Sequence, residues 1–286
     1  MVRHLPRHLI ILVFIVLFFS PWLAAKEEDS DKHAAANQSA YSATPDRRAD
    51  QGEGPHKRLI IRGATLIDGS GAPPTGPMDI VIEGNRIVDI VSVGYPLHPI
   101  DDSKRPQGAT EEIDAHGAYV LPGLVDLHVH ALGDKTAPAD YIYKLWLAHG
   151  ITTVRGVNLG PLDWTLAEQK RSARNQIVAP RIVNYQYTGS GKAWQGKKIL
   201  TPKDAKKWVQ YIAKQGADGL KLGAHPPAIM EALLTEAKKH QLGSTAHLGQ
   251  NGVAQMNALD AARLGLGGMT HFYGLFEALY KDHDVQ

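Results

Sequence analysis

Five side chains stand out by type and position, and four of them are histidines, which can bind divalent metal ions. His128 and His130 stand two residues apart at the end of an apolar run that begins at Leu124. Side chains at positions i and i+2 of a β-strand lie on the same face, so both imidazoles are expected to point the same way. Two neutral imidazoles one strand step apart can bind one divalent ion. The pair alone is a weak signal, because two polar strand residues need no metal.

Three later apolar runs each add one residue of this kind. Lys221 lies between Leu220 and Leu222, and His247 and His271 end the next two runs. A lysine is almost never buried in an apolar strand without a partner. In a parallel α/β barrel the active site is assembled from the carboxyl ends of several strands. We therefore expect these residues to meet at one site.

Composition narrows the chemistry further. The 286 residues include no cysteine, which excludes disulfides, thiolate metal ligands and a cysteine nucleophile. Lys and Arg number 31 against 29 Asp and Glu, so the net charge is +2. This near balance excludes nucleic-acid binding by bulk charge. Without cysteine, any metal bound here must be held by histidine, carboxylate or rarer ligands.

Strands and helices alternate from about residue 118 onward. One helix is clearly delimited, with Thr201 as its N-cap, Pro202 at its first position and Gly216 at its end. Such alternation predicts parallel βαβ units, and either a barrel or a doubly wound sheet fits this pattern. The expected strands are Leu124 to His130, Thr152 to Val157, Arg181 to Tyr187, Gly219 to Leu222, Ser244 to Leu248 and Gly268 to Phe272.

A smaller β-unit precedes these repeats. Leu59 to Ile67 reads as a strand, and Met78 to Glu83 and Arg86 to Val93 form a hairpin around Gly84-Asn85. Residues 58 to about 120 are therefore expected to form a β-meander. A unit of this size cannot cover both of its faces and should pack on a larger neighbour.

The N-terminal segment indicates export. Arg3 and Arg7 precede an apolar run from Leu9 to Phe19, followed by small residues up to Ala25. This order is typical of a secretory signal peptide, and residues 1–25 can alternatively serve as an uncleaved anchor. Residues 26–57 contain no Ile, Leu, Val, Met, Phe or Trp and are expected to form a disordered tether. We expect an exported, periplasmic or cell-envelope protein that contacts the membrane only through its N-terminal segment.

Taken together, the motifs resemble the amidohydrolase superfamily of metal-dependent hydrolases. The similarity is to the branch with a composite β-domain, which includes imidazolonepropionase-like and Xaa-Pro-dipeptidase-like members. It implies an α/β fold with a TIM-type (β/α)8 barrel at 121–286 and a small N-terminal β-sandwich-like domain at 58–120. The matching stretches are Gly63 to Gly69, Pro122 to His130, His149 to Arg155, Gly216 to Lys221 and the strands ending at His247 and His271.

The resemblance also implies a role for each candidate residue. His128 and His130 resemble the ligands of the more buried ion, and His247 and His271 those of a second. Lys221 resembles the lysine that reacts with CO2 and bridges both ions as a carbamate. The implied cofactors are two divalent ions, with zinc the expected metal, and a bridging hydroxide that attacks an amide-like or cyclic C–N bond.

One expected residue of the family pattern is missing. Members carry an aspartate at the end of the eighth barrel strand, and no counterpart occurs here, so the catalytic acid or base is unassigned. Residues 121–286 have room for between five and six strand-helix units at about 31 residues each. We therefore expect only six strands and an incomplete copy of a longer enzyme. The alternatives are a split enzyme completed by a second, C-terminal chain and a degenerate gene product, and a homo-oligomer also stays open.

Several alternatives stay open at this stage. Arg155 and Tyr187 close the second and third strands, where they could bind substrate or serve only as packing residues. A mononuclear, deaminase-like hydrolase would use His128, His130 and His247 and leave Lys221 unmodified. A non-catalytic envelope protein that binds metal or a partner is the third hypothesis, and the missing aspartate favours it.

Overall fold

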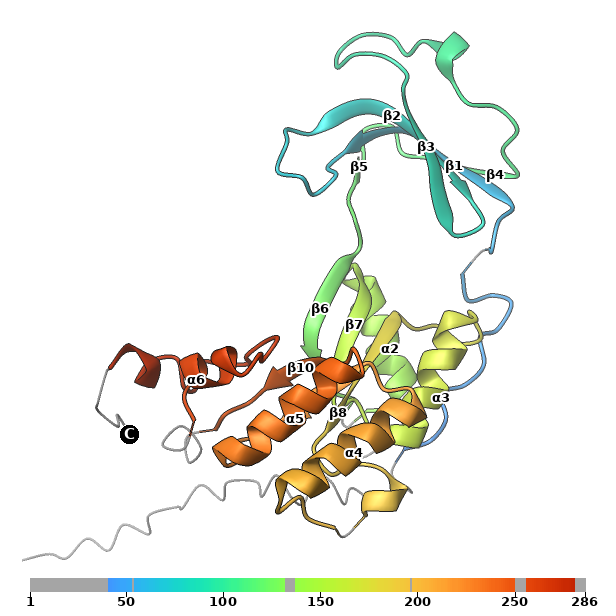
Figure 1. Cartoon of the computed structure of the whole chain (residues 1–286). Coiled ribbons are helices and arrows are strands. Elements are labelled where there is room, and N and C mark those ends of the chain that lie inside the picture. The colour runs from blue at the N-terminus through green and yellow to red at the C-terminus, as the bar shows by residue number, and fades with distance from the viewer. Residues whose placement is uncertain (1–40, 53, 132–136, 196, 250–255, 281–286) are drawn as a thin grey trace, which may run out of the picture.

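The computed structural model describes residues 41–52, 54–131, 137–195, 197–249 and 256–280. It contains a small sheet near the N-terminus and a larger parallel sheet flanked by helices, joined by short connections (Figure 1). The predicted signal peptide or anchor at 1–25 lies outside the described residues. In the part of the chain that is described, no helix has the length and apolar character needed to cross a membrane.

The small sheet has five strands. β1 (Arg58–Leu66), β2 (Thr75–Glu83) and β3 (Arg86–Ser92) are antiparallel, as the hairpin signal predicts. β4 (Glu111–Asp114) and β5 (Tyr119–Val120) instead pair with β1 in parallel, so the prediction of a simple meander is wrong for these two strands. The connection from β3 to β4, with the 3-10 turn η2 (Asp102–Lys104), is long enough to carry the chain back to the start of β1.

The larger sheet contains five parallel strands in sequential order. They are β6 (Leu124–Val129), β7 (Ile151–Val157), β8 (Arg181–Tyr187), β9 (Gly219–Leu222) and β10 (Gly243–Ala246). A doubly wound sheet reverses its strand order, whereas a barrel does not. The order therefore decides for the barrel, of which the curled sheet forms about half (Figure 1).

The predicted length of the sixth strand is wrong. Among the described residues, Gly268 to Phe272 contributes a single parallel bridge between Met269 and Ala246. The left-handed backbone of His271, at φ 64°, takes the chain out of the extended conformation two residues later. The segment still lies beside β10, which keeps His271 near the other candidate ligands.

Helices follow the strands and bury their apolar sides against the sheet. They are α2 (Ala139–Ala148), α3 (Leu162–Ala173), α4 (Pro202–Gln215), α5 (Pro227–Lys239) and the short α6 (Ala258–Arg263), with 3-10 turns η3 (Lys192–Trp194) and η4 (Glu277–Leu279). α4 begins and ends where predicted, with a Thr201–Asp204 capping box and a left-handed Gly216. Trp208 and Ile212 of α4 are completely buried in the main core with Leu220 of β9.

The segment before β1 differs from the expected disordered tether. Thr44 is buried, and its hydroxyl donates a hydrogen bond to the equally buried carboxylate of Glu168 on α3. Arg171 of α3 donates to Asp46, and the Trp164 indole donates to the Ser42 carbonyl. The tether prediction is thus wrong for residues 41–52, while 26–40 lie outside the described part. Polar contacts hold this segment, which is why the lack of aliphatic residues was misleading.

We expect the Thr44→Val variant to lose about 1–3 kcal/mol of unfolding free energy, because Oε2 of the buried Glu168 carboxylate then loses the Thr44 hydroxyl donor, while Arg171 still donates to Oε1. Equilibrium denaturation with urea measures the loss. Asp46→Asn is the matched control, since the Asp46 side chain is 86% exposed and its ion pair with Arg171 should contribute about 0–1 kcal/mol. Equal losses in the two variants would contradict a structural role for Thr44.

Candidate metal centre

The two histidines at the end of β6 point toward each other. The Nε2 atoms of His128 and His130 lie 3.2 Å apart, as expected for side chains on one strand face. Two nitrogens bound to one tetrahedral zinc at about 2.0–2.1 Å would lie about 3.3–3.4 Å apart. The separation of the pair therefore suits a shared ion.

The other two predicted histidine ligands adjoin this pair. The His271 ring lies 5.2 Å from the His128 ring and 4.7 Å from the His247 ring, measured between centroids. His247 follows β10, and His271 follows the bridge beside it. Imidazoles from three separate segments thus form one continuous group, here called the histidine cluster: His128, His130, His247 and His271.

The cluster is not a finished coordination sphere. Within the described residues, no three or more His, Asp or Glu side chains converge with a geometry that could hold an ion. The chemistry of the donor set nevertheless fits a soft to borderline divalent metal, because imidazole nitrogen is a preferred zinc ligand. The ligand assignment from the sequence therefore stays a prediction, supported by proximity.

Burial keeps the imidazoles of His128 and His247 neutral. Burial, with added repulsion from Lys221, lowers the pKa of His128 to about 4. Burial also lowers the pKa of His247, again with a smaller contribution from Lys221. A histidine must be neutral to bind a metal ion. Both side chains are thus in the ligating state at neutral pH.

Lys221 lies on β9, next to the edge strand β10. Its side chain is buried on β9, and Nζ donates a hydrogen bond 3.1 Å long to the Thr270 hydroxyl. Burial, with repulsion from Arg155, lowers its pKa to about 8. The prediction that this lysine is a buried residue with a polar partner is confirmed, although the partner is a hydroxyl.

The two proposed substrate residues occupy different depths. The prediction that Arg155 ends its strand is wrong, because β7 continues to Val157. Its Nε donates to the Leu127 carbonyl at 2.8 Å, and its guanidinium lies over the Tyr185 ring. Arg155 therefore forms part of the floor under the cluster. Tyr187 does end β8 and pairs in register with Lys221, so a role at the site mouth stays a prediction.

Three residues near the cluster were missed in the sequence. The Tyr273 ring stacks on His247 at 5.1 Å with an interplanar angle of 5°. Thr270 receives the Lys221 hydrogen bond, and Thr245 lies beside Lys221 in register on β10. Tyr273 and Thr245 each stand two positions from a histidine, which is a weak signal of a shared face. Threonine in a strand is too common to have been singled out.

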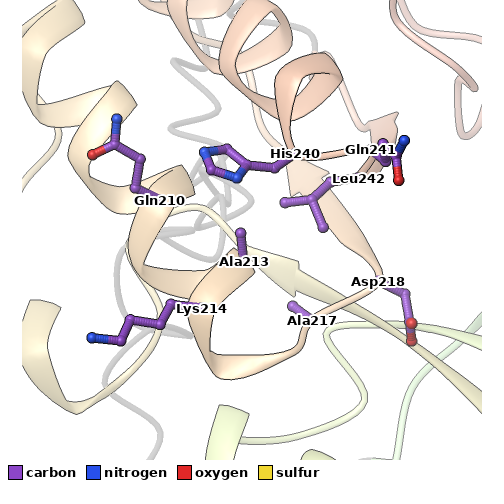
Figure 2. Close-up of a pocket in the computed structure, with 8 residues that line it drawn as sticks. All are labelled: Gln210, Ala213, Lys214, Ala217, Asp218, His240, Gln241 and Leu242. Atoms are coloured by element: carbon purple, nitrogen blue, oxygen red, sulfur yellow. The ribbon is translucent and has the colours of Figure 1, made fainter.

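A depression of about 470 Å³ lies at the opposite end of the sheet (Figure 2). It is lined by residues that precede β9 and β10, including Lys214, Asp218 and His240. The Asp218 carboxylate already accepts hydrogen bonds from the Asn184 backbone and the Gln169 amide. In barrels this end of the strands serves stability, so we do not assign the site to it.

Comparison with known proteins gives partial matches. A segment of 130 residues is 58% identical to an adenine deaminase from Methanoculleus marisnigri, covering 42% of this chain and 23% of the deaminase. Another segment, of 110 residues, is 36% identical to N-acyl-D-aspartate deacylase from Alcaligenes xylosoxydans xylosoxydans. It covers 37% of this chain and 19% of the deacylase. No protein-family model matches the chain.

Solved structures show the same fold. A Xaa-Pro dipeptidase with methionine in its active site superposes with a TM-score of 0.56 at 22% identity, covering 74% of this chain and 61% of that one. A crystal structure described as an amidohydrolase gives a TM-score of 0.58 at 19% identity. The match covers 74% of this chain and 60% of the amidohydrolase chain. The chain thus spans less than two thirds of the length of these relatives and neighbours.

Proposed function

The relatives and the structural neighbours support the amidohydrolase superfamily, and from this we propose that the chain carries the metal-binding strands of a hydrolase acting on C–N bonds. The observation that carries the proposal is the histidine cluster around a buried lysine, at the carboxyl ends of parallel strands. That end of a barrel is where catalytic residues gather.

In this proposal the histidine cluster and Lys221 hold two ions in the roles predicted from the sequence. His128 and His130 would hold the first ion, His247 and His271 the second, and Lys221 would bridge them as a carbamate. Divalent ions at this position supply Lewis acidity toward a carbonyl and lower the pKa of a bound water. The chain itself supplies the neutral imidazoles of His128 and His247 and the stacked Arg155 and Tyr185 side chains.

The buried amine favours carbamate formation. The Nζ lone pair attacks the carbon of CO2, an N–C bond forms, and the nitrogen releases a proton to solvent. Only the neutral amine reacts. With a pKa of about 8, about a tenth of Lys221 is neutral at pH 7, against roughly one in three thousand for an ordinary lysine. The carbamate form is therefore chemically accessible at neutral pH.

A second candidate reaction is deamination with a single ion. The similarity to adenine deaminase favours it, and so does the close pairing of His128 and His130. In this version His247 completes the ligand set and Lys221 stays unmodified. Metal stoichiometry distinguishes the two versions.

The proposal extends to the substrate and the cellular location. Arg155 and Tyr187 lie near the cluster, and Tyr187 is the better placed to contact a small-molecule or peptide-like substrate at the mouth. Export to the periplasm or cell envelope rests on the N-terminal sequence alone. A homo-oligomer or a second chain that completes the barrel is part of the same proposal.

Zinc stoichiometry and hydrolysis test the proposed function. The chain is stripped with a chelator and reloaded with zinc, with and without bicarbonate, and bound zinc is measured by elemental mass spectrometry. We expect two ions per chain with bicarbonate and fewer without it. One ion per chain with and without bicarbonate supports the mononuclear version. Absence of stoichiometric zinc contradicts the two-ion version and the one-ion version alike.

Hydrolysis is then measured on N-acyl amino acids, Xaa-Pro dipeptides, cyclic amides and aminopurines. We expect product formation to stop on chelation and to return with zinc. Product formation that persists after chelation would overturn the metal-dependent mechanism. Stoichiometric zinc with no hydrolysis of any compound would support a non-catalytic, metal-binding protein.

A further inference from the structure

A buried hydroxyl next to Lys221 has no hydrogen-bond partner. Thr245 is completely buried on β10, and within the described residues its Oγ1 neither donates nor accepts a hydrogen bond. Thr245 pairs in register with Lys221 across the parallel strands, so both side chains lie on the inner face. An unsatisfied buried hydroxyl is costly and calls for an explanation.

The second hydroxyl beside Lys221 is already oriented. Thr270 Oγ1 lies 3.0 Å from the Ala246 carbonyl and 3.1 Å from Lys221 Nζ. A carbonyl can only accept, so the Thr270 proton is donated to Ala246. Toward Lys221 the Thr270 hydroxyl is therefore an acceptor of N–H. A carbamate nitrogen retains one N–H, so this hydrogen bond persists through the modification.

The space beside Thr245 favours an anion. A Cβ placed on Gly268 would lie 3.5 Å from Thr245 Oγ1 and 3.9 Å from Arg155 Nη1, so both groups face the same small region. In the described residues Arg155 forms no salt bridge with a carboxylate; its Nε donates to the Leu127 carbonyl, and its charge repels the Lys221 ammonium. Carbamylation turns Lys221 from a cation into an anion, so a donor hydroxyl and the Arg155 guanidinium then match its oxygens.

We propose that Thr245 and Thr270 form a hydroxyl pair that positions the carbamate of Lys221, Thr270 accepting its N–H and Thr245 donating to one of its oxygens. This inference rests on the two-ion version of the proposed function. It makes both threonines positioning residues, which act through Lys221. It also explains why a hydroxyl is left unpaired in the unmodified chain.

The test is the bicarbonate dependence of carbamate formation in the zinc-loaded chain. Carbamate is detected by NMR with ¹³C-bicarbonate, and bound zinc is measured alongside. We expect Thr245→Val to raise the bicarbonate concentration for half-occupancy about tenfold or more, as for loss of a hydrogen bond to a charged group. Thr245→Ser should restore occupancy. Thr270→Val should change half-occupancy far less, because the Thr270 hydrogen bond is present before and after the modification. Thr165→Val, which alters a buried threonine on α3, is the matched control.

Thermal unfolding of the metal-free chain is a second measurement, and it distinguishes a positioning role of Thr245 from a purely structural one. Thr245→Val removes an unsatisfied hydroxyl and should raise the midpoint, whereas Thr270→Val removes the partner of Lys221 and should lower it. Half-occupancy of Thr245→Val within twofold of wild type would overturn the inference while leaving the proposed function intact. Absence of carbamate in the wild-type chain would overturn both.

Discussion

The His128→Asn, His130→Asn double variant is expected to bind zinc roughly a thousandfold or more weakly than the wild-type chain, because two of the proposed ligands are lost. Asparagine keeps a polar side chain of similar reach, so the strand should be preserved. Competition against a chromogenic chelator gives the affinity. Circular dichroism of the same samples verifies that the fold is retained.

His149→Asn serves as the matched control for this variant. His149 caps α2 and forms a hydrogen bond through Nδ1 to the Leu145 carbonyl, away from the cluster. We expect its zinc affinity to equal that of the wild type within experimental error. Tight zinc binding in the double variant would place the ion elsewhere and exclude the predicted ligand set.

The Lys221→Met variant is expected to behave in opposite ways with and without metal. In the metal-free chain it should gain roughly 2–3 kcal/mol of stability at pH 7, since the pKa of Lys221 falls from 10.5 to about 8 on folding. Zinc binding should fall to one ion or fewer, because methionine cannot form a carbamate. Urea denaturation and elemental analysis measure the two effects.

The pH dependence of unfolding free energy tests whether desolvation of the Lys221 ammonium causes the stability gain of Lys221→Met. Between about pH 8 and 10.5 the unfolded chain binds the Lys221 proton and the folded chain does not, so wild-type stability rises with pH in this window. The advantage of Lys221→Met should therefore be complete below pH 8 and vanish above pH 10.5. A gain that stays constant over this range would contradict desolvation of the ammonium as its cause.

Much of the fold was predictable because local signals agree with tertiary structure. The strand bounds of β8 and β9 match the apolar runs, and α4 keeps its cap, its first-turn proline and its terminal glycine. The i, i+2 spacing of His128 and His130 led directly to the observed pair. These features depend on residues close in sequence, so spacing alone is informative.

Long-range contacts account for most of the errors. The order of residues 41–52 depends on Glu168 and Arg171, which no local pattern connects to Thr44. The depth of Arg155 depends on the Leu127 carbonyl and on Tyr185 from neighbouring strands. The roles of Thr245 and Thr270 require knowledge of which hydroxyl has a partner. Such facts emerge only once strands are placed side by side.

The contact between Thr44 and Glu168 also constrains the order of folding. These residues are 124 positions apart, and the small sheet and the first strands of the half-barrel lie between them. Closing so large a loop costs conformational entropy that is recovered only after both ends are structured. During synthesis, residues 41–52 must therefore wait for α3 to leave the ribosome, so the small sheet has time to fold before the contact between Thr44 and Glu168 forms.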